Sequence, residues 1–226
     1  MAYLKRLAMP KTWPLARKGS KFIVRPLPGR RLQNSLPIAF IIKYLGFAET
    51  TKEAKFILDS GRVKVNNKVI KEKAFPVGLF DVISFPTIKK NFRLLFKNKK
   101  LFLHEINESE AKLKPAKVIK KTILKGNKIQ INLDDGTNTL SKIDCRTGDT
   151  LVMDLEKNKF LPIKLEKNSL AYLLGGKYLG KLIRILDIKE KEAICELDSK
   201  KIDVQKRYIF VIGKEKPIIS LPEENK

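Results

Sequence analysis

The stretch SLPIAFIIKYLGFAETTKEAKFILDSG, residues 35–61, decides what kind of fold the first half of the chain contains. Ile38, Ile41, Ile42 and Leu45 are spaced i, i+3, i+4, i+7, which places them on one face of a helix. A strand would instead alternate apolar and polar residues at every second position. The spacing therefore predicts a helix with one buried face.

Residues at the expected helix ends support two helices in this stretch. We expect Ser35 to cap the first helix, with Pro37 in its first turn and Gly46 at its end. Thr50 and Glu53 have the spacing of a capping box, which predicts the start of a second helix. The predicted buried face of the second helix is Ala54, Ile57 and Leu58, and Gly61 is its predicted stop.

Short strand signals follow the two helices. Residues 63–65 and 69–70 flank a turn at Asn66 and Asn67, and a further strand is predicted over 81–85. We therefore expect a small helix–helix–sheet module over residues 37–90. Bases gather near its helix ends and first strand: Lys43, Lys52, Lys55, Arg62 and Lys64.

The rest of the chain is expected to be β, which makes the fold class α+β and mostly β. Ile129, Ile131 and Leu133 alternate with polar residues and meet Asp134-Asp135-Gly136, a hairpin signal. Many short strands separated by turns predict a barrel-like arrangement. We expect a central β-barrel-like domain over 91–171, an SH3-like barrel over 172–213 and a flexible tail over 214–226.

The charge is large and unevenly distributed. The 226 residues include 48 Lys plus Arg and 24 Asp plus Glu, a formal net charge of +24. Residues 1–36 hold nine bases, and the first acid of the chain is Glu49. This balance argues against an ordinary metabolic enzyme and favours a polyanion as the partner, of which nucleic acid is the commonest.

Residues 1–36 are predicted to form an extended basic arm. Pro10, Pro14, Pro26 and Pro28 disfavour a helix there. Phosphates would neutralise the arm and release counterions. Trp13, the only tryptophan, has two possible roles: it stacks on an exposed base or ribose, or it anchors the arm on the protein's own core.

The sequence contains little that would support catalysis. Cys145 and Cys195 are too few for a zinc finger and are expected to be reduced, buried core residues. His104, the only histidine, lies in a strand-like run. The Asp134, Asp135 and Asp149 carboxylates sit at predicted turns, where aspartate is ordinary.

Gly175 to Lys181 reads G-x-x-x-x-G-K, the frame of a phosphate-binding P-loop. Leu182 stands where that motif needs Ser or Thr, and residues 182–186 look like a strand, not a helix. We expect a glycine-rich turn that leads into a barrel strand. The longest apolar run, residues 37–42, is far too short to span a membrane, and the N-terminus does not look like a signal peptide.

Five motifs, in order along nearly the whole chain, resemble the e-type small-subunit ribosomal protein four family of archaea and eukaryotes. They are residues 3–14 (YLKRLAMPKTWP), 53–55 (EAK), 61–63 (GRV), 75–83 (FPVGLFDVI) and 210–214 (FVIGK). By this resemblance, residues 37–86 look like an S-four RNA-binding domain and 172–213 like a KOW domain. Tyr178 and Ile183 depart from the usual Asn and Gly of the KOW turn, which points to a packing role there. The lack of a long extra tail fits an archaeal source.

The resemblance implies a structural, non-catalytic protein that binds small-subunit rRNA in the cytoplasmic ribosome, beside neighbouring ribosomal proteins. We expect no cofactor, metal, membrane contact, small-molecule substrate or homo-oligomer. The candidate RNA-binding residues are Lys5, Arg6, Lys11, Trp13, Arg17, Lys18, Lys21, Arg25, Arg30, Arg31, Lys43, Lys52, Lys55, Arg62, Lys64, Lys177 and Lys181. Two alternatives remain at this point: an RNA-modifying enzyme with an RNA-binding module, and a KOW-bearing factor that binds another protein.

Overall fold

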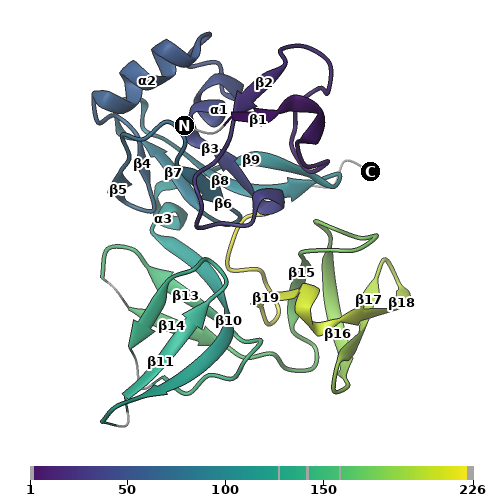
Figure 1. Ribbon diagram of the computed structural model, residues 1–226. Helices are drawn as coiled ribbons and strands as arrows, with labels where there is room; N and C mark the ends of the chain where they lie inside the picture. Colours follow the sequence, from purple (N-terminus) through teal and green to yellow (C-terminus); the bar gives the residue numbers. More distant parts are fainter. Residues whose placement is uncertain (1–2, 127, 141–142, 158, 223–226) are drawn as a thin grey trace. The chain divides into compact units, whose positions relative to one another are not determined.

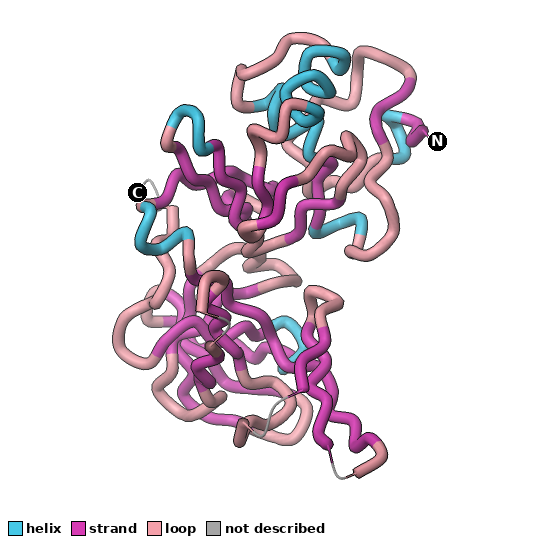
Figure 2. Tube along the Cα trace, turned by 90° about the vertical axis from the view of Figure 1, so that its left-hand side faces the viewer, coloured by secondary structure: helices cyan, strands magenta, loops and turns pink. Residues whose placement is uncertain are grey.

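The structure is a computed structural model that describes residues 3–126, 128–140, 143–157 and 159–222 (Figure 1). The chain divides into two compact units. Unit 1 comprises residues 1–96 and 100–112, and unit 2 comprises residues 97–99 and 113–226. Strands dominate both units, and Figure 2 shows that the helices are few and short, so the expected mostly-β class is confirmed.

The N-terminal arm is folded back on itself in unit 1. Strand β1 (Tyr3–Lys5) pairs antiparallel with β2 (Phe22–Val24), and the two form a small hairpin-like sheet. Short 3-10 helices, η1 (Arg6–Ala8) and η2 (Leu32–Asn34), interrupt the path. The arm is therefore extended only locally.

Both predicted helices are present, with one correction at the start of the first. Helix α1 spans Ile38–Tyr44 and α2 spans Thr51–Asp59. Ser35 is not the cap: it begins strand β3 (Ser35–Pro37), which pairs with β6 (Pro76–Gly78). The Ser35 hydroxyl donates to the Arg31 carbonyl, and Pro37 occupies the cap position without a side-chain hydrogen bond.

The other helix signals are confirmed. Gly46 follows the end of α1 with φ +77°, a left-handed value that glycine adopts without strain. The Thr50–Glu53 capping box is formed in both directions. Hydrogen bonds from the backbone, first that of Glu49, hold the pKa of Glu53 below its ordinary value. Ala54 and Leu58 are buried and Ile57 is half-buried, as the pattern predicts.

A five-stranded sheet completes unit 1, in the order β5-β4-β7-β8-β9. Its strands are β4 (Lys64–Val65), β5 (Lys68–Val69), β7 (Val82–Phe85), β8 (Lys90–Lys97) and β9 (Lys100–Ile106), with the 3-10 helix η3 (Pro86–Ile88) between β7 and β8. Asn66 and Asn67 both have positive φ, as a tight hairpin between β4 and β5 requires.

The expected domain boundary between residues 90 and 91 does not match the structure. Strand β7 pairs with β8 across that point, from Val82↔Arg93 to Phe85↔Lys90, so the sheet is continuous. Arg93 is fully buried and forms an ion pair with Glu110 of the short helix α3 (Glu108–Ala111). Unit 1 consequently extends to residue 112.

Unit 2 contains two five-stranded antiparallel sheets. The first has the order β12-β11-β10-β13-β14, with β10 (Leu113–Leu124), β11 (Lys128–Leu133), β12 (Asn138–Leu140), β13 (Thr150–Asp154) and β14 (Phe160–Ile163). The second has the order β18-β17-β16-β15-β19, with β15 (Leu170–Leu173), β16 (Leu182–Ile188), β17 (Glu192–Leu197), β18 (Lys200–Gln205), η4 (Lys206–Tyr208) and β19 (Ile209–Gly213). The predicted hairpin at Asp134-Asp135-Gly136 is confirmed by the pairing of β11 with β12.

The two sheets of unit 2 share a core. Val152 and Ile163 of the first sheet pack in one cluster with residues of β15, β16, β17 and β19. Both cysteines are buried and free, as expected, and burial raises the pKa of the Cys195 thiol to about 11. The tail expected to be flexible is partly packed: Ile219 is 1% exposed, and the Ile218 amide donates to the Ile212 carbonyl.

Candidate nucleic-acid interface

A groove of about 630 Å³ lies in unit 1 between the β1–β2 sheet and helices α1 and α2. The arm and the helices meet there because Trp13 of the arm is inserted beside α1. Its ring is 1% exposed and stacks on Phe40 with centroids 6.3 Å apart, while its Nε1 donates to the Leu32 carbonyl at 3.1 Å. Of the two roles considered for Trp13, the structure shows the anchor, and base stacking by this ring is excluded.

Aromatic side chains line both walls of the groove. On the helix wall, Phe40 stacks on Tyr44 with centroids 5.8 Å apart, so Trp13, Phe40 and Tyr44 form a column that ends at the surface. On the opposite wall, the ring centroids of Tyr3 and Phe22 lie 6.4 Å apart. Tyr3, Phe22 and Tyr44 are 61%, 50% and 45% exposed.

The lining of the groove is basic. Arg6, Lys43, Lys52, Lys55 and Lys73 are among its described lining residues, and none of those residues is acidic. Four of these bases are in the predicted set, and Lys73 was missed because it stands in a loop without a helical or strand pattern. The aromatic residues other than Trp13 were also missed, since aromatic residues at helix or strand spacing usually indicate core.

Arg6 and Arg17 form hydrogen bonds within the arm itself. The Arg6 guanidinium donates to the Ala16 carbonyl and the Ser20 hydroxyl, and Arg17 donates to the Leu7 carbonyl. Gly19 lies against Arg6 so closely that a Cβ there would be 2.6 Å from Arg6 Nη1, and its φ is +129°. Both arginines retain surface exposure, so their loop contacts do not hide them.

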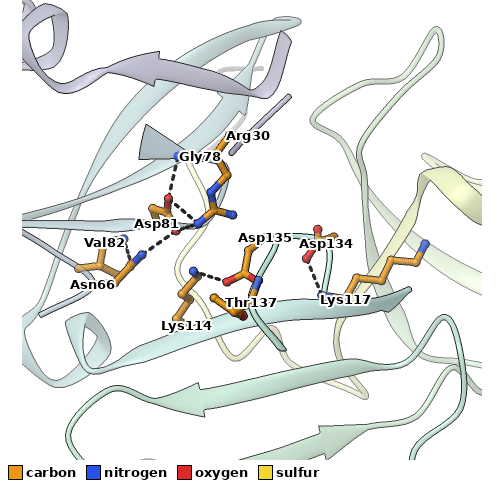
Figure 3. Close-up of polar contacts among 10 residues, drawn as sticks. All are labelled: Arg30, Asn66, Gly78, Asp81, Val82, Lys114, Lys117, Asp134, Asp135 and Thr137. Carbon is orange, nitrogen blue, oxygen red and sulfur yellow. Dashed lines mark hydrogen bonds and ion pairs between the residues drawn. The ribbon is translucent and has the colours of Figure 1, made fainter. Parts of the chain in front are cut away.

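Arg30 was predicted to bind RNA, but the structure gives it a different partner. Its guanidinium donates to both carboxylate oxygens of the buried Asp81, at 2.9 and 3.0 Å (Figure 3). Asp81 also accepts from Asn66 Nδ2 and the Gly78 amide, and Asn66 Oδ1 accepts from the Val82 amide. Arg30 therefore fastens the end of the arm to the sheet and is committed to a protein carboxylate.

The other predicted bases of unit 1 lie on its surface. All of them are exposed except Lys64, which is half-buried in β4. The exposed set is Lys5, Lys11, Lys18, Lys21, Arg25, Arg31, Lys43, Lys52, Lys55 and Arg62. These side chains are available to phosphates, and only Lys43, Lys52 and Lys55 of them line the groove.

The glycine-rich turn of unit 2 presents the two remaining predicted bases. Lys177 Nζ lies 5.5 Å from the Tyr178 ring centroid, and Lys181 forms an exposed ion pair with Asp198 at 3.6 Å. The residue after Lys181 begins strand β16, so the P-loop frame leads into a strand as predicted. Tyr178 packs against the core and Ile183 is buried. Both observations agree with the packing role expected because these residues replace the usual Asn and Gly of the KOW turn.

Two further bases of unit 2 are used inside the protein. Lys114 Nζ lies 2.5 Å from an Asp135 carboxylate oxygen, and both side chains are buried (Figure 3). Burial alone would raise the pKa of Asp135, but Lys114 and Thr137 together lower it below its ordinary value. Lys117 Nζ donates to the carbonyls of Lys206, Arg207 and Ile209.

The described residues contain no cluster of three or more His, Cys, Asp or Glu side chains that could hold a metal ion. In the same residues no helix is long and apolar enough to cross a membrane. The surface features of unit 1 are therefore positive charge, a groove and exposed aromatic rings.

Comparison with known proteins agrees with this chemistry. The profile described as "Ribosomal family S4e" matches residues 88–160, the "RS4NT (NUC023) domain" matches residues 3–29 and the "S4 domain" matches residues 36–83. The small ribosomal subunit protein eS4 of Methanocaldococcus jannaschii is 38% identical, with 97% of each chain covered. The chain belongs to the S4e family of ribosomal proteins.

Other S4e proteins support the assignment. The small ribosomal subunit protein eS4 of Archaeoglobus fulgidus is 36% identical over 96% of this chain and 97% of its own length. The crystal structure of the 30S ribosomal protein S4e from Thermoplasma acidophilum matches with a TM-score of 0.71 and 28% identity, and covers 82% of this chain and 99% of that one. The S4e family is a family of ribosomal structural proteins and not of enzymes, which argues against the RNA-modifying alternative.

Proposed function

We propose that this protein is a structural constituent of the small ribosomal subunit that binds and stabilises folded small-subunit rRNA and thereby supports translation. The observation that carries the proposal is the surface of unit 1, where exposed bases of an arm without acids meet the bases of an S4 domain. Membership of the S4e family supports small-subunit rRNA as the partner of this surface.

The mechanism is phosphate neutralisation combined with recognition of RNA shape. Folded rRNA packs phosphates closely, and lysine and arginine side chains relieve the repulsion while releasing counterions. Arg25, Arg31 and Arg62 can bind a phosphate through two parallel N–H groups, whereas the lysines act as point charges. Such contacts fix orientation and read no base sequence directly.

Each part of the chain has a role in this proposal. Residues 1–36 are the RNA-binding arm and the S4-type module follows; the predicted exposed bases of both contact phosphate. The sheet β15–β19 is an SH3-like barrel of the KOW type, whose turn contributes Lys177 and Lys181. The remaining surfaces face neighbouring ribosomal proteins in the cytoplasmic ribosome, and the protein acts as one copy without a cofactor.

The test replaces exposed arm charges without disturbing the arm's anchors. Lys5, Lys11, Lys18 and Lys21 are exposed, so changing all four to Gln should leave Trp13 and Arg30 in place. We expect affinity for small-subunit rRNA to fall, and the slope of log K against log salt to shrink by about 3 if each lysine neutralises one phosphate. Filter binding at several salt concentrations measures both quantities.

A matched control removes the same charge elsewhere. Lys189, Lys191, Lys200 and Lys201 are four exposed lysines of the C-terminal sheet, and their replacement by Gln should change the salt slope by less than the arm replacement does. Equal effects of the two quadruple variants would show that only net charge matters. An unchanged affinity in the arm variant would refute the role given to the arm.

A further inference from the structure

We infer that the groove between the β1–β2 sheet and helices α1 and α2 holds an unstacked nucleotide of a single-stranded RNA segment, with its base against Tyr44. The inference rests on the proposed function and adds to it a ligand class and a site. The groove, its aromatic walls and its bases together carry the inference.

The size and lining of the groove suit a flat, partly apolar ligand. Its volume of about 630 Å³ lies within the range of roughly 300–1,000 Å³ that small-molecule sites occupy. A nucleobase has an apolar face and a polar edge, and it stacks on aromatic side chains whatever its identity. Tyr44 on one wall and Phe22 on the other offer such faces.

The aromatic column fixes the Tyr44 ring. Trp13 is buried and hydrogen-bonded through Nε1, Phe40 stacks on it, and Tyr44 stacks on Phe40. An exposed ring that is held from behind loses little freedom when a base stacks on its outer face, and this pre-organisation favours binding. A base on Tyr44 would be the fourth member of the column.

The positive charge of the groove lining favours an anionic ligand. Lys43, Lys52 and Lys55 of the helices, Lys73 of the loop before β6 and Arg6 of the arm line the groove, with no acid among the described lining residues. A neutral or cationic ligand would gain nothing from this charge, and an acidic peptide would not use the two aromatic walls. A nucleotide uses both, because its phosphate meets the bases while its ring meets Tyr44 or Phe22.

A duplex is excluded by the same geometry. Bases in a helix are stacked on their neighbours and paired at their edges, so their faces cannot reach an aromatic wall. The groove therefore selects loops, bulges or ends of rRNA. In contrast, the exposed lysines outside the groove can contact the phosphates of paired RNA as well.

The first experiment uses the full chain and a single-stranded RNA that carries one 2-aminopurine, with the same strand annealed into a duplex as a comparison. Stacking quenches 2-aminopurine, so we expect quenching on binding of the single strand and none with the duplex. Tyr44→Ala should weaken binding about tenfold and remove most of the quenching, since one stacked base contributes on that scale. Tyr44→Phe should restore both.

The chain offers a matched control on α2. Phe56 is 71% exposed and does not line the groove, so Phe56→Ala should leave affinity and quenching unchanged. Phe22→Ala tests the opposite wall and should reduce the quenching. The fluorescence of Trp13, the only tryptophan, verifies in each variant that unit 1 is folded.

The outcomes separate this inference from the proposed function. If small-subunit rRNA binds normally but neither Tyr44→Ala nor Phe22→Ala changes single-strand affinity or quenching, the inference is overturned and the proposed function stands. A protein segment crosslinked to Tyr44 in assembled subunits would likewise overturn it. If the wild-type chain binds no rRNA at all, the proposed function itself fails.

Discussion

The arm of residues 1–36 and strand β10 are both rich in bases, and they use them in opposite ways. The arm holds nine bases and no acid, and most of them are exposed. In β10, Lys114 and Lys117 are buried, where one pairs with Asp135 and the other donates to three backbone carbonyls. Net charge alone would treat these lysines as equivalent.

The difference shows that burial and nearby acceptors, whether carboxylates or backbone carbonyls, determine whether a base is available to RNA. No acid stands within the arm in sequence. The arm base Arg30 reaches a carboxylate 51 positions away, at Asp81. Exposed bases of unit 2 more often have a neighbouring acid, as in the Lys167–Asp187 and Lys214–Glu166 pairs. The outward positive field is consequently stronger around the arm.

The largest expected effect comes from breaking the buried pair with Asp135→Asn. The change leaves the Lys114 ammonium buried without its carboxylate, which should cost about 3–5 kcal/mol of stability. Cys145 and Cys195 are both buried in unit 2 and are the only thiols, so their labelling in urea reports the opening of that unit. Trp13 fluorescence reports unit 1, which should unfold as before.

Asp187→Asn is the control for that experiment. Its pair with Lys167 is short, at 2.7 Å, but both side chains are substantially exposed. The expected loss of stability is much smaller than for Asp135→Asn, because water screens an exposed pair. Equal losses for the two variants would contradict the structural role assigned to Lys114 and Asp135.

The second effect concerns Lys117 and pH. Burial lowers the pKa of Lys117 from 10.5 to about 8, although the Asp134 carboxylate opposes the shift. Between these values the unfolded chain binds more protons than the folded one, so folding becomes more favourable as the pH rises. The free energy of unfolding should be higher than at pH 7 by about 3 kcal/mol at the upper end of that window.

Lys117→Met isolates this contribution. The variant lacks both the titrating amine and its hydrogen bonds to carbonyls, so its stability carries no contribution from the titration of Lys117. Urea unfolding followed by circular dichroism should show the stability difference between wild type and variant changing between pH 8 and 10.5 in favour of the wild type. A difference that stays flat across this window would argue against the lowered pKa.

The smallest effect distinguishes two lysines of the predicted set, Lys52 and Lys181. Lys52 lines the groove, whereas Lys181 faces Asp198 at 3.6 Å. Lys52→Gln should reduce the salt slope for rRNA binding by somewhat less than 1, and Lys181→Gln by a smaller amount, because its charge is already partly balanced. A larger effect at Lys181 would place the dominant RNA contact in unit 2 and reverse the comparison.

Local patterns predicted the parts of the fold that local physics determines. The spacing of Ile38, Ile41 and Ile42 and the Thr50–Glu53 capping box identified both helices of unit 1. The Ser35 cap was wrong because pairing of β3 with β6, about forty positions away, outweighed a local capping preference. The boundary after residue 90 was wrong because η3 interrupts the chain without interrupting the sheet.

The candidate site was predictable in its charges and not in its shape. Residue type and position identified Lys43, Lys52 and Lys55, and the structure places all three at one groove. The role of Trp13 depended on Phe40, 27 positions away, and a stack of that kind leaves no periodic signal in sequence. Tyr3 and Phe22, which form the facing wall, were missed for the same reason, because no periodic pattern links them.

The contacts that hold the arm to the rest of unit 1 include the Trp13 ring beside α1 and the Arg30–Asp81 ion pair. A basic tail that orders only on RNA must give up its conformational entropy at the moment of binding. This arm has already given up much of that entropy when the protein folds. Its binding to rRNA should therefore resemble the docking of a rigid body. The heat-capacity change on binding should be modest, because the arm is already ordered before it meets the RNA.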